Sequence, residues 1–268
     1  MDSSTHPKES QGPGSRDEKI RLTNVSKSFG GRKVVDIERL DLGRHGIEGL
    51  IGPNGAGKTT LMNLITHQLR ADSGEVIYSP NHQGTSLTQK KPDEIARLGI
   101  VKSNQIIQDF ESLTIKDSML LANCPPRYER FYRIFSEGQL REESADELAE
   151  YLEYFHFQDA SSYALSAGEK KLLDIIRCLL LKPRFLLLDE PTAGLPEDQT
   201  NLMMELMAKK TKEEDISILI VEHDLDLIWE VCEFVHFMAE GEILLQGSPT
   251  DIRGNRTLAE KYLGSSHV

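Results

Sequence analysis

Residues 52–59 of the chain read GPNGAGKT. It fills every fixed position of the phosphate-loop pattern G-x-x-x-x-G-K-[ST], with an apolar strand pattern at 49–51 before it and a helical pattern at 58–69 after it. Glycines let successive backbone N–H groups curl around an anion, and the following helix presents its positive end to that anion. Lys58 can reach the β- and γ-phosphates, and the Thr59 hydroxyl can ligate Mg²⁺. The stretch therefore predicts a nucleoside triphosphate site built from Gly52, Pro53, Asn54, Gly55, Ala56, Gly57, Lys58, Thr59 and Thr60.

A second apolar strand pattern, residues 185–188, ends in two acidic residues. We expect Asp189 to hold the Mg²⁺ ion of the nucleotide, because a phosphate loop needs a carboxylate from a neighbouring strand. Glu190 follows at the carboxyl edge of the expected sheet, where ligands bind in α/β proteins. Its predicted role is to orient and deprotonate the attacking water. The alternative is that Glu190 only caps the strand.

Strand and helix patterns alternate around these two motifs. Strands are expected at residues 20–25, ending in a turn over 26–31, and at 34–42, 49–51, 185–188, 216–221 and in a hairpin over 235–246. Helices are expected at 58–69, 170–181, 201–210 and in the tail of the chain. Residues from about 93 to 164 are predicted to be mainly helical, with an apolar stripe of Leu148, Tyr151, Leu152 and Phe155. The pattern indicates an α/β fold with a parallel core and a helical insertion.

Composition is that of an ordinary soluble globular chain. The 268 residues carry 31 basic and 43 acidic side chains, a net charge of −12, and 38% are hydrophobic. No apolar run approaches the roughly 20 residues that span a bilayer, and the acidic balance argues against a nucleic-acid partner. Residues 1–19 lack an apolar segment and predict a disordered tail, so the folded domain is expected over 20–268. Cys124, Cys178 and Cys232 form no CxxC pair and indicate buried thiols in a reducing, cytosolic compartment.

Residues 165–169, Leu-Ser-Ala-Gly-Glu, resemble the LSGGQ signature of ATP-binding cassette ATPases. The span from about 20 to 264 is similar to that family in the expected order of motifs. The resemblance implies a P-loop NTPase core with a parallel sheet, an N-terminal antiparallel β subdomain and a helical subdomain inserted at about 93–164. It also implies that Gln105 bridges the Mg²⁺ and water site to the insertion, that His223 contacts the γ-phosphate, that residues 193–195 form the D-loop, and that Phe29 stacks on adenine with Val34 beside it.

The resemblance further implies a dimer. Ser166 and Gly168 would serve the γ-phosphate of the nucleotide held by an opposite cassette, so ATP would hold two cassettes head to tail until hydrolysis. Two residues depart from the signature: Ala167 replaces its first glycine and Glu169 its glutamine. The methyl group of Ala167 is tolerable if that residue has a negative φ. Asn104 stands where relatives often have an aromatic residue before the glutamine.

Three segments, residues 51–60, 190–195 and 259–264, resemble most the cassettes of bacterial branched-chain amino acid and urea/amide uptake systems. This implies an ATPase subunit in the cytoplasm, peripheral on the inner face of the cell membrane. Its implied partners are a second cassette, integral membrane permease subunits and a periplasmic solute-binding protein. The alternatives are a soluble cassette without a membrane partner, as in metallocluster assembly, the ATPase of an exporter, and a nucleotide-gated regulatory module. Intact Asp189, Glu190 and His223 argue against the last.

Overall fold

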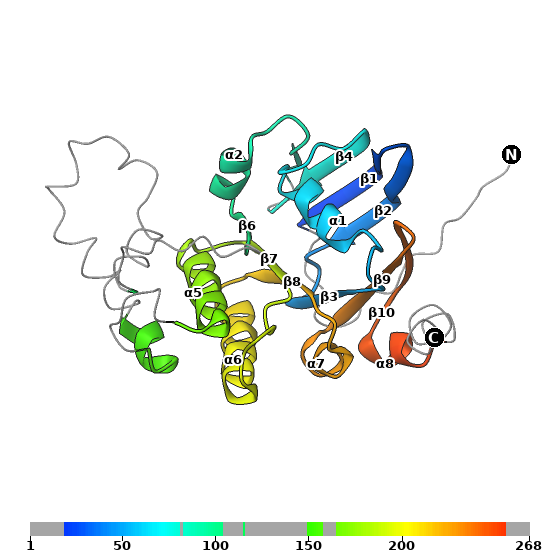
Figure 1. The fold of residues 1–268 in the computed structure, drawn as a ribbon. Coiled ribbons are helices and arrows are strands. Elements are labelled where there is room, and N and C mark those ends of the chain that lie inside the picture. Colours follow the sequence, from blue (N-terminus) through cyan, green and yellow to red (C-terminus); the bar gives the residue numbers. More distant parts are fainter. Residues whose placement is uncertain (1–18, 81–82, 104–114, 116–148, 158–164, 256–268) are drawn as a thin grey trace, which may run out of the picture.

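The computed structural model describes residues 19–80, 83–103, 115, 149–157 and 165–255. These residues form two β-sheets, one of four strands and one of six, with helices packed on them (Figure 1). Among the described residues, no helix combines the length and the apolar character needed to cross a membrane.

The four-stranded sheet is antiparallel and opens the chain. Its order is β2-β1-β4-β5, with β1 at Ile20–Phe29, β2 at Arg32–Leu42, β4 at Ser73–Tyr78 and β5 at Thr85–Ser86. A tight turn joins β1 to β2, and Gly30 and Gly31 supply the positive φ angles that it needs. The sheet matches the antiparallel N-terminal part that the sequence resemblance implies.

The six-stranded sheet has the order β10-β9-β3-β8-β7-β6. Its strands are β3 Ile47–Ile51, β6 Ile100–Lys102, β7 Phe185–Asp189, β8 Ser217–Val221, β9 Phe234–Ala239 and β10 Glu242–Gly247. All neighbours are parallel except β9 and β10. The strands β3, β7 and β8 are buried at every residue, which explains why apolar residues predominate in them. In the register, Val221 lies opposite both Leu50 and Asp189, so β3 and β7 end at the same edge of the sheet.

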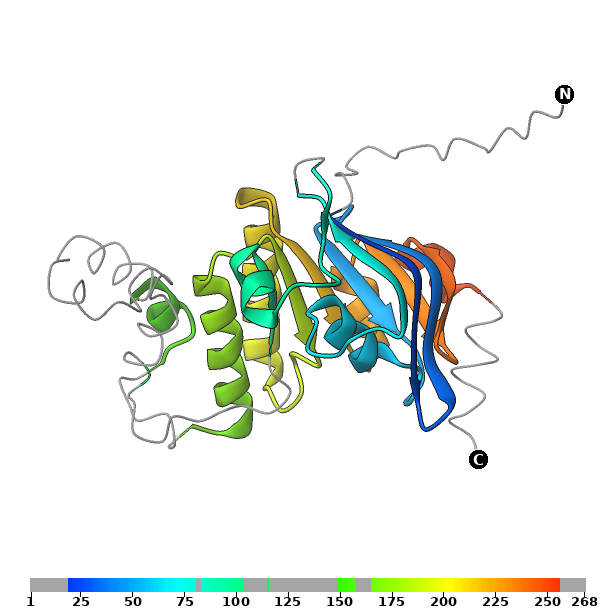
Figure 2. The same cartoon turned by 90° about the horizontal axis from the view of Figure 1, so that it is seen from above.

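Helices cover both faces of this sheet. The helix α1 (Lys58–Ile65) packs between the two sheets, whereas α5 (Ala167–Leu180) and α6 (Glu197–Glu213) cover the other face (Figure 2). The side chains of β7 alternate accordingly: Leu186 and Leu188 join the core under α5 and α6, and Leu187 joins the core with α1. Shorter helices are α2 Pro92–Arg97, α7 Leu225–Val231 and α8 Pro249–Arg253, and residues 149–154 are helical.

Several element boundaries differ from the sequence predictions. The strand expected to end at residue 25 continues to Phe29, because pairing with β2 holds the polar end of β1 in the sheet. The helix expected over 58–69 ends at Ile65, since His67 takes a positive φ of 53°. The parallel strand β6 lies inside the region from about 93 to 164 that the sequence predicts to be mainly helical. A three-residue strand is too short to show a period.

The described residues begin at Lys19, the last residue of the predicted tail. Lys19 is 4% exposed, and its ammonium group donates hydrogen bonds to the backbone oxygens of Arg184 and Asp215. The rest of the predicted tail, residues 1–18, and most of the predicted helical insertion, 104–114, 116–148 and 158–164, lie outside the described residues.

Burial and pairing perturb several titratable groups of the fold. Burial raises the pKa of Cys232 to about 12 and raises that of Cys178 well above its ordinary range, which agrees with the predicted buried thiols. Cys124 lies outside the described residues. Burial also acts to raise the pKa of Asp41, but hydrogen bonds from Arg21 and Arg39 outweigh it and leave that pKa lowered.

Candidate functional site

The phosphate loop lies where the two sheets meet. Residues 52–57 leave the carboxyl end of β3, and Gly57 caps α1 with a φ of 104°. A side chain at Gly57 would place its Cβ 2.5 Å from the carbonyl oxygen of Val34, so only glycine fits. The backbone N–H of Gly241 donates to the Ala56 oxygen at 3.1 Å, which ties the loop to the β9–β10 turn. The loop is thus fixed from both sheets.

Lys58 sits inside this loop with only 7% of its surface exposed. Its ammonium nitrogen donates to the carbonyl oxygens of Gly52 at 2.6 Å and Pro53 at 3.1 Å. Burial lowers the pKa of Lys58 below its ordinary 10.5, and the negative charges of Asp189 and Glu190 oppose that shift. The loop therefore presents a buried amine beside two carboxylates at the start of a helix, where phosphate oxygens bind well.

Asp189 and Thr59 form the candidate metal pair. The Thr59 hydroxyl donates to Asp189 Oδ2 at 3.2 Å, although the two residues lie 130 positions apart. Asp189 is 1% exposed, and its backbone N–H donates to the hydroxyl oxygen of Ser103 at 3.3 Å. A hydroxyl and a carboxylate are oxygen ligands suited to Mg²⁺, which commonly takes one or two protein carboxylates together with substrate phosphates. The residues present therefore fit the ion.

Sequence reasoning missed the support around this pair. Ser103 follows β6, and its backbone N–H donates to the Leu187 oxygen at 2.9 Å. Lys102, also from β6, donates to Asn63 Oδ1 of α1 at 2.6 Å. Burial lowers the pKa of Lys102, and the charge of Asp189 opposes this. Because the sequence predicted a helix where β6 lies, it did not indicate that Lys102 and Ser103 support the site.

Glu190 and His223 meet across two strand ends. His223 Nε2 donates to Glu190 Oε1 at 3.0 Å, and the two side chains are 44% and 33% exposed. The Glu190 backbone has a φ of 50°, an unusual value for a residue with a side chain, and its N–H donates to the Val221 oxygen at 2.8 Å. The exposed carboxylate can thus reach a water beside the phosphate loop while the imidazole orients it.

Ser166 begins the signature helix α5. Its hydroxyl accepts from the Glu169 backbone N–H at 3.2 Å, and the Glu169 carboxylate accepts from the Ser166 N–H at 2.8 Å. These two hydrogen bonds form a capping box at the start of α5. Glu169, which replaces the glutamine of the signature, therefore has a structural role in this box. Ala167 lies in the helix without a positive φ, so the condition for its methyl group is met.

The remaining predicted residues fall into two groups. Phe29, at the end of β1, is 49% exposed, with Lys27 Nζ 5.6 Å from its ring centroid, and the carbonyl oxygen of Val34 faces Gly57 of the phosphate loop. Gln105 lies outside the described residues.

Comparison with known proteins identifies the family. The family model described as ABC transporter matches residues 36–193, more than half of the chain. The chain belongs to the ABC transporter family. It is an ATP-binding cassette that binds nucleotide and hydrolyses ATP, and its P-loop α/β fold is confirmed.

Curated relatives of this cassette cover nearly its whole length. The probable branched-chain amino acid transport ATP-binding protein LivG of Archaeoglobus fulgidus is 34% identical over 252 residues, covering 92% of this chain and 95% of the relative. The high-affinity branched-chain amino acid transport ATP-binding protein LivG of Escherichia coli K12 is 30% identical over 254 residues, covering 92% and 98%. Among solved structures, the ADP conformation of MJ1267, an ATP-binding cassette of an ABC transporter, has a TM-score of 0.76 at 28% identity and covers 93% of this chain and all of that one.

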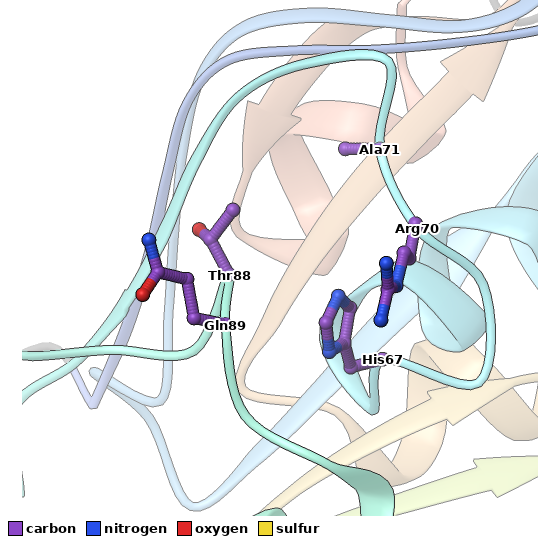
Figure 3. A pocket seen from close by; sticks show the side chains of 5 residues that line it. All are labelled: His67, Arg70, Ala71, Thr88 and Gln89. Carbon is purple, nitrogen blue, oxygen red and sulfur yellow. The ribbon is translucent and has the colours of Figure 1, made fainter.

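A cleft of about 240 Å³ lies away from the phosphate loop of the cassette, after the end of α1 (Figure 3). Its lining residues are His67, Arg70, Ala71, Thr88 and Gln89. His67 Nδ1 donates to the Lys90 carbonyl oxygen, which fixes the imidazole at the wall of the cleft. None of the predicted site residues lines it, so the candidate site is the edge of the six-stranded sheet and not this hollow.

Proposed function

We propose that this cassette energises the import of branched-chain amino acids through a membrane permease. The observation that carries the proposal is the convergence of Lys58, Thr59, Asp189, Glu190 and His223 at one edge of the sheet. The relatives named above support the choice of solute, because their names assign them to branched-chain amino acid transport. Permease subunits, a periplasmic solute-binding protein and a place on the inner membrane face complete the proposal.

In the proposed mechanism the backbone N–H groups of 52–60 and Lys58 bind the phosphates of ATP. Thr59, Asp189 and Gln105 would hold Mg²⁺, and the bound ion would supply positive charge to the phosphates of ATP. Glu190 accepts a proton from the attacking water, and His223 holds the Glu190 carboxylate in place. Phe29 and Val34 pack against the adenine.

We further propose that two cassettes act together. Ser166 and Gly168 of each would complete the nucleotide site of its partner, because the start of α5 presents the Ser166 hydroxyl at an exposed helix N-terminus. The helical insertion at about 93–164 would transmit opening and closing to the permease as part of one ATPase domain over 20–268.

The catalytic assignment is tested by Glu190→Gln, which keeps the shape of the side chain and removes the base. We expect ATP affinity to be retained and the turnover number to fall by roughly 10²-fold or more. Glu197→Gln, an exposed acid at the start of α6, is the matched control and should hydrolyse ATP at the native rate. A native rate in Glu190→Gln would refute the base assignment, and unchanged ATP affinity in Lys58→Ala would refute the phosphate-loop role.

The solute and the dimer need separate experiments. Uptake of radiolabelled leucine should be lost when the gene is deleted and restored by the native gene but not by the Glu190→Gln allele. Leucine uptake that survives the deletion while uptake of urea or an amide is lost would replace the proposed solute. Ser166→Ala should lower ATP turnover while one cassette still binds ATP, and a native turnover number would contradict the shared site.

A further inference from the structure

Glu222 is a buried acid that the proposed mechanism does not use. It follows the end of β8, between Val221 and His223, and is 4% exposed. A buried carboxylate is costly unless its oxygens accept hydrogen bonds, so its partners indicate what it does in the fold.

Those partners lie on the two segments that carry Glu190 and His223. Glu222 Oε1 accepts from the backbone N–H of Thr192 at 2.8 Å and from the Thr192 hydroxyl at 2.6 Å. Glu222 Oε2 accepts from the backbone N–H of His223 at 3.2 Å. One side chain therefore holds both the residue two positions after Glu190 and the backbone of His223 itself.

The turn that starts at Glu190 is short and held by backbone hydrogen bonds. The Ala193 N–H donates to the Glu190 oxygen at 3.3 Å, and the Leu195 N–H donates to the Thr192 oxygen at 3.0 Å. Its far end packs against the start of α5, where a Cβ at Gly168 would lie 2.3 Å from the Gly194 oxygen. The turn is thus held at one end by helix packing and in its middle by Glu222.

Such support is needed because the Glu190 backbone is in an unfavourable conformation. A φ of 50° in a residue with a side chain costs free energy and persists only where neighbouring contacts hold it. The hydrogen bond from His223 to Glu190 also requires both segments to keep their spacing.

We propose that Glu222 is a positioning residue for ATP hydrolysis: it clamps the Thr192 turn to the end of β8 and so sets the geometry of the Glu190–His223 pair. The proposal rests on the proposed role of Glu190 as the base. A glutamine at 222 would keep the shape but offer one acceptor oxygen in place of two, and would turn charge-assisted hydrogen bonds into weaker neutral ones.

The test compares Glu222→Gln with two variants of its partner. Glu222→Gln should lower the turnover number roughly tenfold and leave the KM for ATP within about twofold, because misplacement affects the reaction step while Lys58 still binds the phosphates. Thr192→Val, which loses the hydroxyl donor, should also lower the turnover number. Thr192→Ser, which retains the hydroxyl, should keep a turnover number closer to the native value than that of Thr192→Val.

Glu48→Gln is the matched control. Glu48 is 1% exposed near the start of β3, away from the phosphate loop, and accepts from the backbone N–H groups of Gly43 and His45. It should lower the melting temperature about as much as Glu222→Gln and leave the turnover number unchanged.

Three outcomes would overturn the proposal: a native turnover number in Glu222→Gln, an equal loss in Glu48→Gln, or no difference between Thr192→Val and Thr192→Ser. If Glu222→Gln does not fold, the two Thr192 variants still decide the question. Failure of the proposed function is distinguishable, because it would appear as a native rate in Glu190→Gln whatever Glu222→Gln does.

Discussion

The contact between Gly168 and Gly194 makes the stability of Gly168→Ala a sharp test of the packing at the start of α5. Alanine is normally the better helix residue by up to about 1 kcal/mol, so helix propensity alone predicts stabilisation. In this structure the added Cβ would lie 2.3 Å from the Gly194 oxygen and 2.8 Å from its carbonyl carbon. Both neighbours are backbone atoms, and no side-chain rotation can relieve the clash.

The overlap decides the sign of the effect. Ordinary non-bonded contacts lie near 3.5 Å, so the turn or the helix would have to move by about 1 Å. Overpacking of this kind costs about 1–3 kcal/mol. After the gain in helix propensity, we expect a net loss of about 1–2 kcal/mol, or roughly 3–6 °C in melting temperature for a chain of this size.

Thermal unfolding followed by circular dichroism measures this shift. Gly254→Ala is the control, because Gly254 has a φ of −82° and its nearest neighbour to an added Cβ is 3.7 Å away. This substitution should stabilise the protein by about 0.4–1 kcal/mol, because alanine lowers the conformational entropy of the unfolded chain. A melting temperature of Gly168→Ala at or above the native value would refute the close contact.

Three further predictions concern groups outside the site. Glu48→Ala should destabilise the protein by roughly 3 kcal/mol or more in urea, because it leaves buried N–H donors and the His236 ring without their acceptor. Asp41→Asn should lower the free energy of unfolding by about 1 kcal/mol near pH 7. Because the pKa of Asp41 is lowered in the folded state, this loss should shrink as the pH falls through that pKa. Urea midpoints of the native and variant proteins near pH 7 and about pH 3 would show the change. Cys178 and Cys232 should resist alkylation at about pH 8 until denaturant is added, as peptide mapping would reveal, because burial raises both thiol pKa values.

Local sequence was enough to predict the parts of the site that follow directly from strands. The phosphate loop and the pair Asp189 and Glu190 each come after an apolar run, and a parallel sheet brings such ends to one edge. The same reasoning could not predict β6, because three residues are too few to show a hydrophobic period. The sequence therefore did not indicate that Lys102 and Ser103 lie beside Asp189.

The sequence alone determined the nucleotide chemistry of this cassette, because a phosphate loop and a strand-terminal carboxylate are made of neighbouring residues with fixed spacing. Only the tertiary structure shows which contacts position the catalytic residues. Glu222 accepts from Thr192 across 30 positions, and Gly168 meets Gly194 across 26. Such contacts depend on which strand ends and helix starts the fold brings together, and no local pattern of side chains records that.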